Sequence, residues 1–88
     1  MLPLYYALMK YYSTVDEACV EDAMEALKGT YSHFKQFKKS SLTEAIMTAK
    51  SNGLLDESRF DLDANNELRV YYKVNDYGRK MIHDYIKG

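Results

Sequence analysis

The segment DLDANNELRV, residues 61 to 70, places Asp61, Asp63 and Asn65 at alternate positions, as the first oxygen ligands of an EF-hand calcium loop are placed. Such a loop also requires a glycine at its sixth position and a bidentate glutamate at its twelfth. Those positions hold Asn66 and Tyr72. Because Tyr72 has no carboxylate and Asn66 does not favour the sharp turn as glycine does, the sequence predicts no calcium site here.

Other reactive side chains also lack the spacing that catalysis or metal binding needs. Cys19 is the single cysteine and lies among acidic residues, which disfavour its thiolate. His33 and His83 are 50 residues apart, and neither has a second His or Cys at ligand spacing. The four glycines are isolated and form no phosphate-binding loop. We therefore expect a protein that is not an enzyme and that binds no metal and no cofactor.

Charge is segregated along the chain although the net charge is only −1. The formal charges of residues 1 to 27, 28 to 50, 56 to 67 and 69 to 88 are −4, +4, −4 and +3. Lysines and hydroxyl groups of the basic segments are typical phosphate ligands. The sequence therefore suggests a nucleic-acid surface made of Lys35, Lys38, Lys39, Ser41, Thr43, Lys50, Arg69 and Lys73.

Three helices are expected in the first part of the chain. Apolar spacing predicts a first helix over residues 2 to 13. A second helix should begin at Thr14 or Asp16 as N-cap and end at Gly29. A third should begin at Ser40 or Ser41 and end at the Asn52-Gly53 step, and residues 31 to 39 before it should form a short helix or a tight turn.

A β-hairpin explains residues 58 to 74 better than a calcium loop does. Phe60, Leu62, Leu68, Val70, Tyr72 and Val74 all occupy even positions, which gives a strand pair one apolar face. We expect residue 62 to pair with residue 70 and residue 60 with residue 72, around a loop of about three residues. This register places Asp63 opposite Arg69 on the polar face.

A final helix should follow Asn75, which is a suitable N-cap. The core positions expected on this helix are Met81, Ile82, Tyr85 and Ile86. The predicted fold is mainly α with a small β-hairpin, in the order helix, helix, short helix or turn, helix, strand, strand, helix. We expect one domain over residues 1 to 88, because the chain has no Pro/Gly/Ser-rich linker.

The segments AIMTAKSNGLLDE and LRVYYKVNDYGRKMIHDYI resemble the winged helix-turn-helix superfamily, in particular regulators of the MarR and PadR types. The matching features are the Gly53-Leu54 step after the third helix, the hairpin, the capping Asn75 and the glycine Gly78 in the final helix. The resemblance covers residues 41 to 88 well, whereas in the first forty residues only the order of the helices matches. It implies a winged-helix fold and a transcriptional regulator that contacts duplex DNA.

Two features depart from that pattern. Residues 31 to 39 are longer than the usual turn between the second and third helices. The expected recognition helix directs Thr43, Glu44, Met47 and Lys50 outward and contains no arginine, so base reading by bidentate side chains would be poor.

The alternative function is a winged-helix docking domain that binds protein and no DNA. Nine tyrosines favour it, because tyrosine combines apolar area with a hydrogen bond in interface cores. A homodimer would use the terminal helices, with Tyr6, Tyr11, Tyr77 and Tyr85 at the interface. One cysteine, and an amino terminus without a basic leader, lead us to expect a cytoplasmic protein with no membrane contact.

Overall fold

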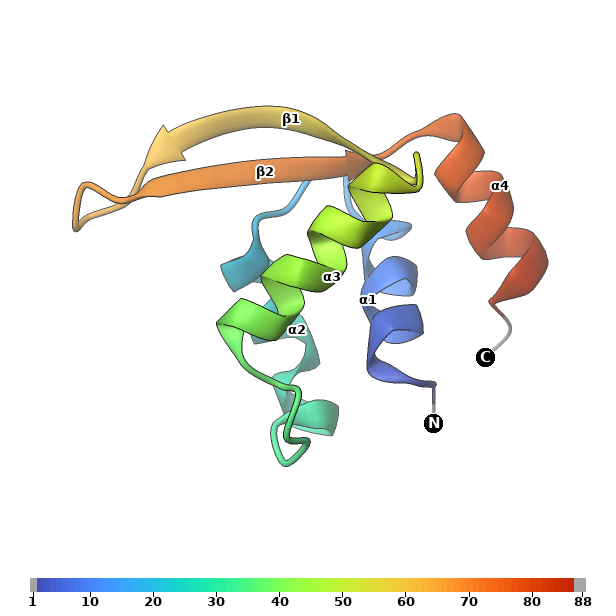
Figure 1. The fold of residues 1–88 in the computed structure, drawn as a ribbon, viewed down its shortest axis with the longest axis horizontal. Helices are drawn as coiled ribbons and strands as arrows, with labels where there is room; N and C mark the ends of the chain where they lie inside the picture. Colours follow the sequence, from blue (N-terminus) through green and yellow to red (C-terminus); the bar gives the residue numbers. More distant parts are fainter. Residues whose placement is uncertain (1, 87–88) are drawn as a thin grey trace.

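The computed structural model of the protein describes residues 2–86. Figure 1 shows the hairpin lying across one end of the helices and extending beyond them, away from the last helix. The predicted order is confirmed, and residues 32–38 form turns rather than a helix. The elements are α1 (Leu4–Tyr12), α2 (Val20–Tyr31), α3 (Lys39–Ser51), β1 (Leu55–Leu62), β2 (Leu68–Val74) and α4 (Asp76–Tyr85).

One core joins the helices to the inner half of the hairpin. Tyr12 is fully buried, and its hydroxyl donates a hydrogen bond of 2.9 Å to the carbonyl oxygen of Ala18. Ala18 and Tyr72 exchange two backbone hydrogen bonds of 2.9 Å, so the loop before α2 pairs with β2. The apolar side chains that meet here include Leu8, Met9, Leu42, Ile46, Ala49, Leu55, Val74 and Ile82.

Both predicted ends of the second helix are wrong. The N-cap of α2 is Cys19, because its neighbour Ala18 pairs with β2 and keeps the chain extended up to that point. Thr14 and Asp16 lie before this pairing and do not cap α2; the Thr14 hydroxyl instead donates a 2.6 Å hydrogen bond to the carbonyl of Tyr11, at the end of α1. Helix α2 also runs past Gly29 to Tyr31.

The start of α3 also differs from the prediction, whereas its end agrees. Its N-cap is Lys38, which makes no side-chain capping bond, and Ser40 and Ser41 lie inside the first turn. At the other end Asn52 is the C-cap, and Gly53 adopts φ +81°. A left-handed backbone of this kind favours glycine, which confirms the predicted stop.

The predicted hairpin register is wrong: in the outer half it is two residues away, and in the inner half Tyr72 pairs with Glu57 and not with residue 60. Leu62 pairs with Leu68, and Phe60 with Val70. The turn sets this register: the Asp63 carboxylate accepts hydrogen bonds from two backbone amides of the loop, and Asn66 takes a left-handed φ of +67°. In this outer half the shift is an even number, so Phe60, Leu62, Leu68 and Val70 share one face as predicted.

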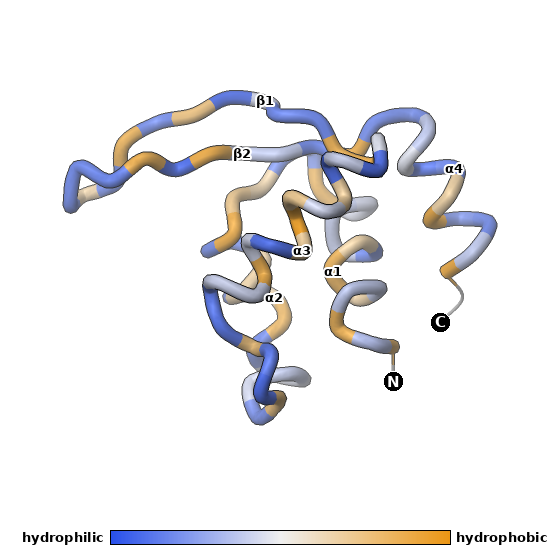
Figure 2. Tube along the Cα trace, viewed as in Figure 1, coloured by the Kyte–Doolittle hydropathy of each residue, from blue (hydrophilic) through white to orange (hydrophobic). Residues whose placement is uncertain are grey.

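A bulge at residue 58 interrupts β1 between its two pairing segments. The inner segment brings Leu55 into the core, whereas Phe60 and Leu62 of the outer segment are 72% and 59% exposed. Figure 2 shows hydrophobic residues continuing along both strands toward the tip of the hairpin. The predicted apolar face is therefore present, but only its inner half packs on the core.

Helix α4 begins as predicted. The Asn75 side chain accepts a 2.7 Å hydrogen bond from the amide of Gly78. Ile82 is buried and Ile86 is half-buried, as expected. Tyr85 is 72% exposed, so its predicted core position is wrong.

Candidate nucleic-acid interface

Helix α3 has one face in the core and one face open to solvent. Leu42, Ile46 and Ala49 lie in the core, and α3 packs against α2 and β1. The opposite face carries hydroxyl, amide and thioether groups together with one carboxylate. A shallow depression on this face is lined by Thr43, Glu44, Met47, Thr48, Ser51 and Asn52.

The amino end of α3 is the most basic part of this surface. Lys35 and Lys38 are exposed, and neither makes a salt bridge within residues 2–86. Helix N-termini attract anions, because their first N–H groups point outward and the helix dipole is positive there. The N-cap residue of α3, Lys38, makes no side-chain hydrogen bond to the first turn. The N–H groups of this turn can therefore donate to an anionic ligand.

Two further lysines of the predicted set are held by acidic side chains. Lys39 lies 2.8 Å from Glu21 of α2, and Lys50 lies 2.7 Å from Glu57 of β1. Each acid raises the pKa of its lysine. Before either lysine could bind a phosphate, it would have to leave this acid.

Arg69 is also paired. Its guanidinium makes hydrogen bonds of 2.9 and 3.1 Å to the two carboxylate oxygens of Asp61, which occupies the cross-strand position predicted for Asp63. This bidentate contact holds the pKa of the Asp61 carboxyl below its ordinary value. In this structure Arg69 therefore links β2 to β1 within the hairpin.

The remaining predicted ligands are dispersed. Thr43 is exposed near the basic end of α3. Ser41 is half-buried and faces a groove between α1 and α3, away from the open face. Lys73 is exposed on β2 opposite Asp56. Lys35, Lys38 and Lys39 lie at or just before the start of α3, and Lys39, Thr43 and Arg69 line one cavity between α3 and the hairpin. Ser41, Lys50 and Lys73 do not line this cavity.

The tip of the hairpin is acidic and lies near this basic end. Asp63 accepts hydrogen bonds from the backbone amides of Asn65 (2.8 Å) and Glu67 (3.0 Å), which lower its pKa and keep it ionised. The charges of Asp63 and Glu67 also contribute, after Glu21, to the raised pKa of Lys39. The tip therefore brings negative charge close to the amino end of α3.

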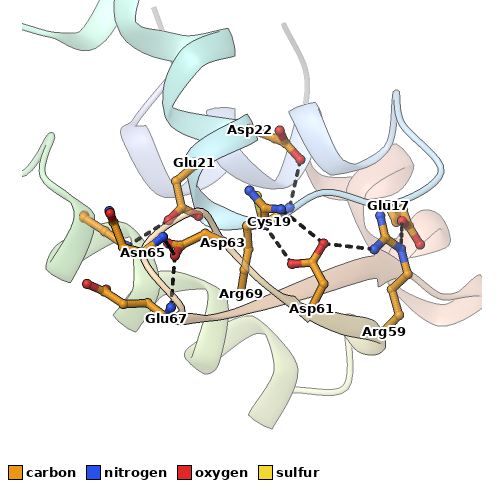
Figure 3. A network of polar contacts seen from close by, with 11 residues as sticks. Glu17, Cys19, Glu21, Asp22, Arg59, Asp61, Asp63, Asn65, Glu67 and Arg69 are labelled. Atoms are coloured by element: carbon orange, nitrogen blue, oxygen red, sulfur yellow. Dashed lines mark hydrogen bonds and ion pairs between the residues drawn. The ribbon is translucent and has the colours of Figure 1, made fainter.

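A polar network that the sequence did not reveal ties the hairpin to the loop before α2 (Figure 3). The Glu17 carboxylate accepts hydrogen bonds from the Ser58 hydroxyl, at 2.6 Å, and from Arg59. The guanidinium of Arg59 lies 3.8 Å from the centre of the Tyr71 ring, a cation–π contact. Glu17 and Arg59 are 42 residues apart in sequence, so no local pattern indicates their contact.

Acid should loosen the attachment of the hairpin. The pKa values of Glu17, Asp61 and Asp63 are all lowered, first by side-chain or backbone hydrogen bonds to the ionised carboxylates. The stabilisation is therefore complete above about pH 5, where these carboxyls are ionised in the unfolded chain as well, and is lost as the pH falls through the lower folded-state pKa values.

Hydrogen exchange of the hairpin amides between pH 5 and pH 2, corrected for intrinsic rates, measures this effect. We expect their protection to fall with acidification more than that of α1 amides. Asp61→Asn should remove part of the pH dependence. Equal loss of protection in the hairpin and in α1 would contradict the assignment.

The tyrosines of the predicted dimer contact occupy different environments. Tyr6 and Tyr85 are 45% and 72% exposed and line an apolar groove between α1 and α4. Tyr77 is exposed at the start of α4 and does not line the groove, and Tyr11 is half-buried against the core. Two of the four tyrosines therefore share a surface.

Comparison with solved structures decides the fold. PadR of Bacillus subtilis, in complex with operator DNA, matches with a TM-score of 0.75 and 20% identity, over 97% of this chain and 49% of the PadR chain. The chain has a winged-helix fold. A predicted transcriptional regulator from Thermoplasma acidophilum shares this winged-helix arrangement, with a TM-score of 0.73 and 13% identity over 93% of this chain and 75% of its own. No protein-family model and no curated protein matches the sequence.

In this winged-helix fold the β1–β2 hairpin is the wing, and α3 is the helix that precedes it. The chain spans about half the length of the PadR chain that it matches. Within residues 2–86 no helix is both long and apolar enough to cross a bilayer. The same residues contain no group of three or more His, Cys, Asp or Glu side chains placed to hold a metal ion.

Proposed function

We propose that this winged-helix domain binds duplex DNA, with α3 in the major groove, and acts as a transcriptional regulator. One observation carries the proposal: α3 and the wing have the arrangement found in a regulator bound to operator DNA, over 97% of the chain. In helix-turn-helix proteins the recognition helix enters the major groove with its amino-terminal residues toward the bases. Here this end of the helix carries the exposed lysines.

Phosphate contacts supply most of the proposed affinity. Lys35 and Lys38 are available without breaking an ion pair, and the uncapped first turn of α3 adds backbone N–H groups. Lys39 contributes once it exchanges Glu21 for a phosphate, and Lys50 once it leaves Glu57. Thr43 and Arg69, which line one cavity with Lys39, complete the proposed set together with Ser41 and Lys73.

Base reading contributes less. The open face of α3 offers Thr48, Ser51 and Asn52 as hydrogen-bonding groups, and Glu44 as an acceptor suited to the amino group of cytosine. No arginine is present in α3 for bidentate contact with guanine. We therefore propose modest sequence preference on top of salt-sensitive binding.

Fluorescence anisotropy with a labelled mixed-sequence duplex tests the proposal. Between about 50 and 200 mM salt, we expect the affinity to fall by on the order of tenfold or more, in proportion to the number of phosphates neutralised. A duplex of peptide nucleic acid, which has the same bases and no phosphates, is the control. Binding to this duplex would measure the contribution of base contacts alone. Absence of binding at both salt concentrations would reject the proposal.

A protein-docking function is the second candidate. The observation in its favour is that Lys39, Lys50 and Arg69 are each held by an acid, and that the wing tip is itself acidic. We propose for this case a homodimer through the groove between α1 and α4, where Tyr6 and Tyr85 are exposed, with Tyr11 and Tyr77 beside it. A monomer mass in sedimentation that does not change with concentration would exclude the dimer.

A further inference from the structure

The outer half of the wing has a free strand edge beside exposed apolar side chains. Within residues 2–86, β1 pairs only with β2, while the other side of β2 pairs with Ala18. Figure 1 shows β1 running along the outside of the molecule. Phe60 is 72% exposed, Leu62 59% and Leu68 65%. Free edges with apolar side chains are sites at which another strand can add.

The pairing pattern identifies which backbone groups this edge presents. The amide of Asp63 donates to the carbonyl of Glu67 at 2.9 Å, so residues 63 and 67 form a hydrogen-bonded pair. In an antiparallel ladder such pairs alternate along the strand, so Asp61 and Arg59 direct their backbone groups toward β2. Phe60 and Leu62 direct theirs away from β2, to the open edge.

We propose that this edge pairs with β1 of a second copy of the chain, in antiparallel orientation, with the two-fold axis at Phe60. A two-fold contact of this kind brings one surface against itself, so the surface must be self-complementary. Pairing Phe60 with Phe60 of the second copy uses outward-directed backbone groups on both chains. It also places Arg59 opposite Asp61 of the second copy, and Asp61 opposite its Arg59.

Charge decides between this register and its neighbour. An axis at Arg59 would place two guanidinium groups opposite each other, which is destabilising. With the axis at Phe60, two pairs of opposite charge flank the centre on the polar face. Each guanidinium and carboxylate already belongs to the network of Glu17, Arg59, Asp61 and Arg69, and the pairing joins the two networks across the axis.

The apolar face gains contacts from the same register. Phe60 meets Phe60 of the second copy directly, and each Leu62 lies diagonal to the opposite ring, within the reach of aromatic cross-strand contacts. The result is a four-stranded sheet. The regular segment is short, because the bulge at residue 58 limits it. We therefore expect a weak dimer, in the class of interfaces that bury less than about 1,200 Å².

Sedimentation equilibrium of the whole chain, up to about 1 mM protein, tests the association expected for an interface of this size. The native chain should show a reversible dimer. Phe60→Lys places two like charges at the axis and should raise the dissociation constant at least about tenfold. Leu68→Lys is the matched control, because Leu68 is equally exposed on the same face but lies on β2, and it should change the constant less than about threefold.

Amide hydrogen exchange locates the contact. The amides of Phe60 and Leu62 should become protected as the protein concentration rises, while that of Asp63, bonded within the hairpin, should not change. A monomer at all concentrations would overturn the proposal, as would equal effects of Phe60→Lys and Leu68→Lys. A dimer that survives Phe60→Lys and is lost in Tyr85→Lys would place the contact on the terminal helices instead.

Discussion

Replacing Gly78 by alanine should destabilise the domain by about 3 kcal/mol, at the upper end of the cost of overpacking. A β-carbon at this position would lie 2.1 Å from the carbonyl oxygen of Leu54 and 2.9 Å from a methyl group of Val74. The oxygen belongs to the backbone and cannot rotate away. Because Leu54 connects α3 to β1, relief requires α4 to move away from the base of the wing.

The loss would be large for a domain of this size. Small domains have total stabilities of roughly 5 to 15 kcal/mol, and about 3 kcal/mol corresponds to a fall in melting temperature of more than about 10 °C. Urea denaturation followed by circular dichroism measures the free energy of unfolding directly.

Gly29→Ala provides the matched control for this substitution. Gly29 lies inside α2, and a β-carbon there would meet no atom within 4 Å. Alanine in a helix interior is favoured over glycine by roughly 0.5 to 1 kcal/mol, so this variant should be more stable than the native chain. If both variants unfolded at the same urea concentration, close packing at Gly78 would not be the reason for glycine at this position.

Local patterns predicted the elements that depend on neighbouring residues. The stop at Asn52-Gly53 and the cap at Asn75 are formed within a few residues, and both are confirmed. The apolar periodicity of α3 is confirmed for the same reason, because Leu42, Ile46 and Ala49 face the core.

Errors arose where a distant segment decides the local conformation. The start of α2 moved to Val20, because the preceding Ala18 pairs with Tyr72, 54 residues away. The residues around Thr14 and Asp16 give no indication of the pairing between Ala18 and Tyr72. The predicted strand register failed because the turn is fixed by the Asp63 carboxylate and by the left-handed Asn66, which the alternation of apolar residues does not specify.

The ion pairs of the candidate site also depend on segments that are distant in sequence, so the sequence did not predict them. The sequence alternates acidic and basic blocks, which suggested a separate basic face. The fold instead places acids of two acidic blocks beside the basic one, with Glu21 at Lys39 and Glu57 at Lys50. Exposed pairs of this kind contribute little to stability, but each removes a lysine from the set that is free to meet a phosphate. Lys35 and Lys38 therefore become the central residues of the proposed interface.

The double substitution Lys35→Glu and Lys38→Glu should lower the affinity for a mixed-sequence duplex on the order of a hundredfold at about 50 mM salt. Both side chains are exposed beside the uncapped start of α3, where a phosphate would meet the positive end of the helix. Reversal removes two phosphate contacts and adds repulsion. The slope of log affinity against log salt should also become shallower by about two, since each lost contact releases about one counterion fewer.

Lys80→Glu combined with Lys28→Glu is the control with the same change in net charge. Among residues 2–86, the salt bridges of these lysines are with exposed acids of their own helices, Asp84 and Glu25, and both lysines lie outside α3 and the wing. The control pair should weaken binding by less than about tenfold, through the general field of the protein alone. Equal losses in the two double variants would show that net charge, and not the amino end of α3, controls DNA binding. An unchanged salt slope in the Lys35 and Lys38 variant would lead to the same conclusion.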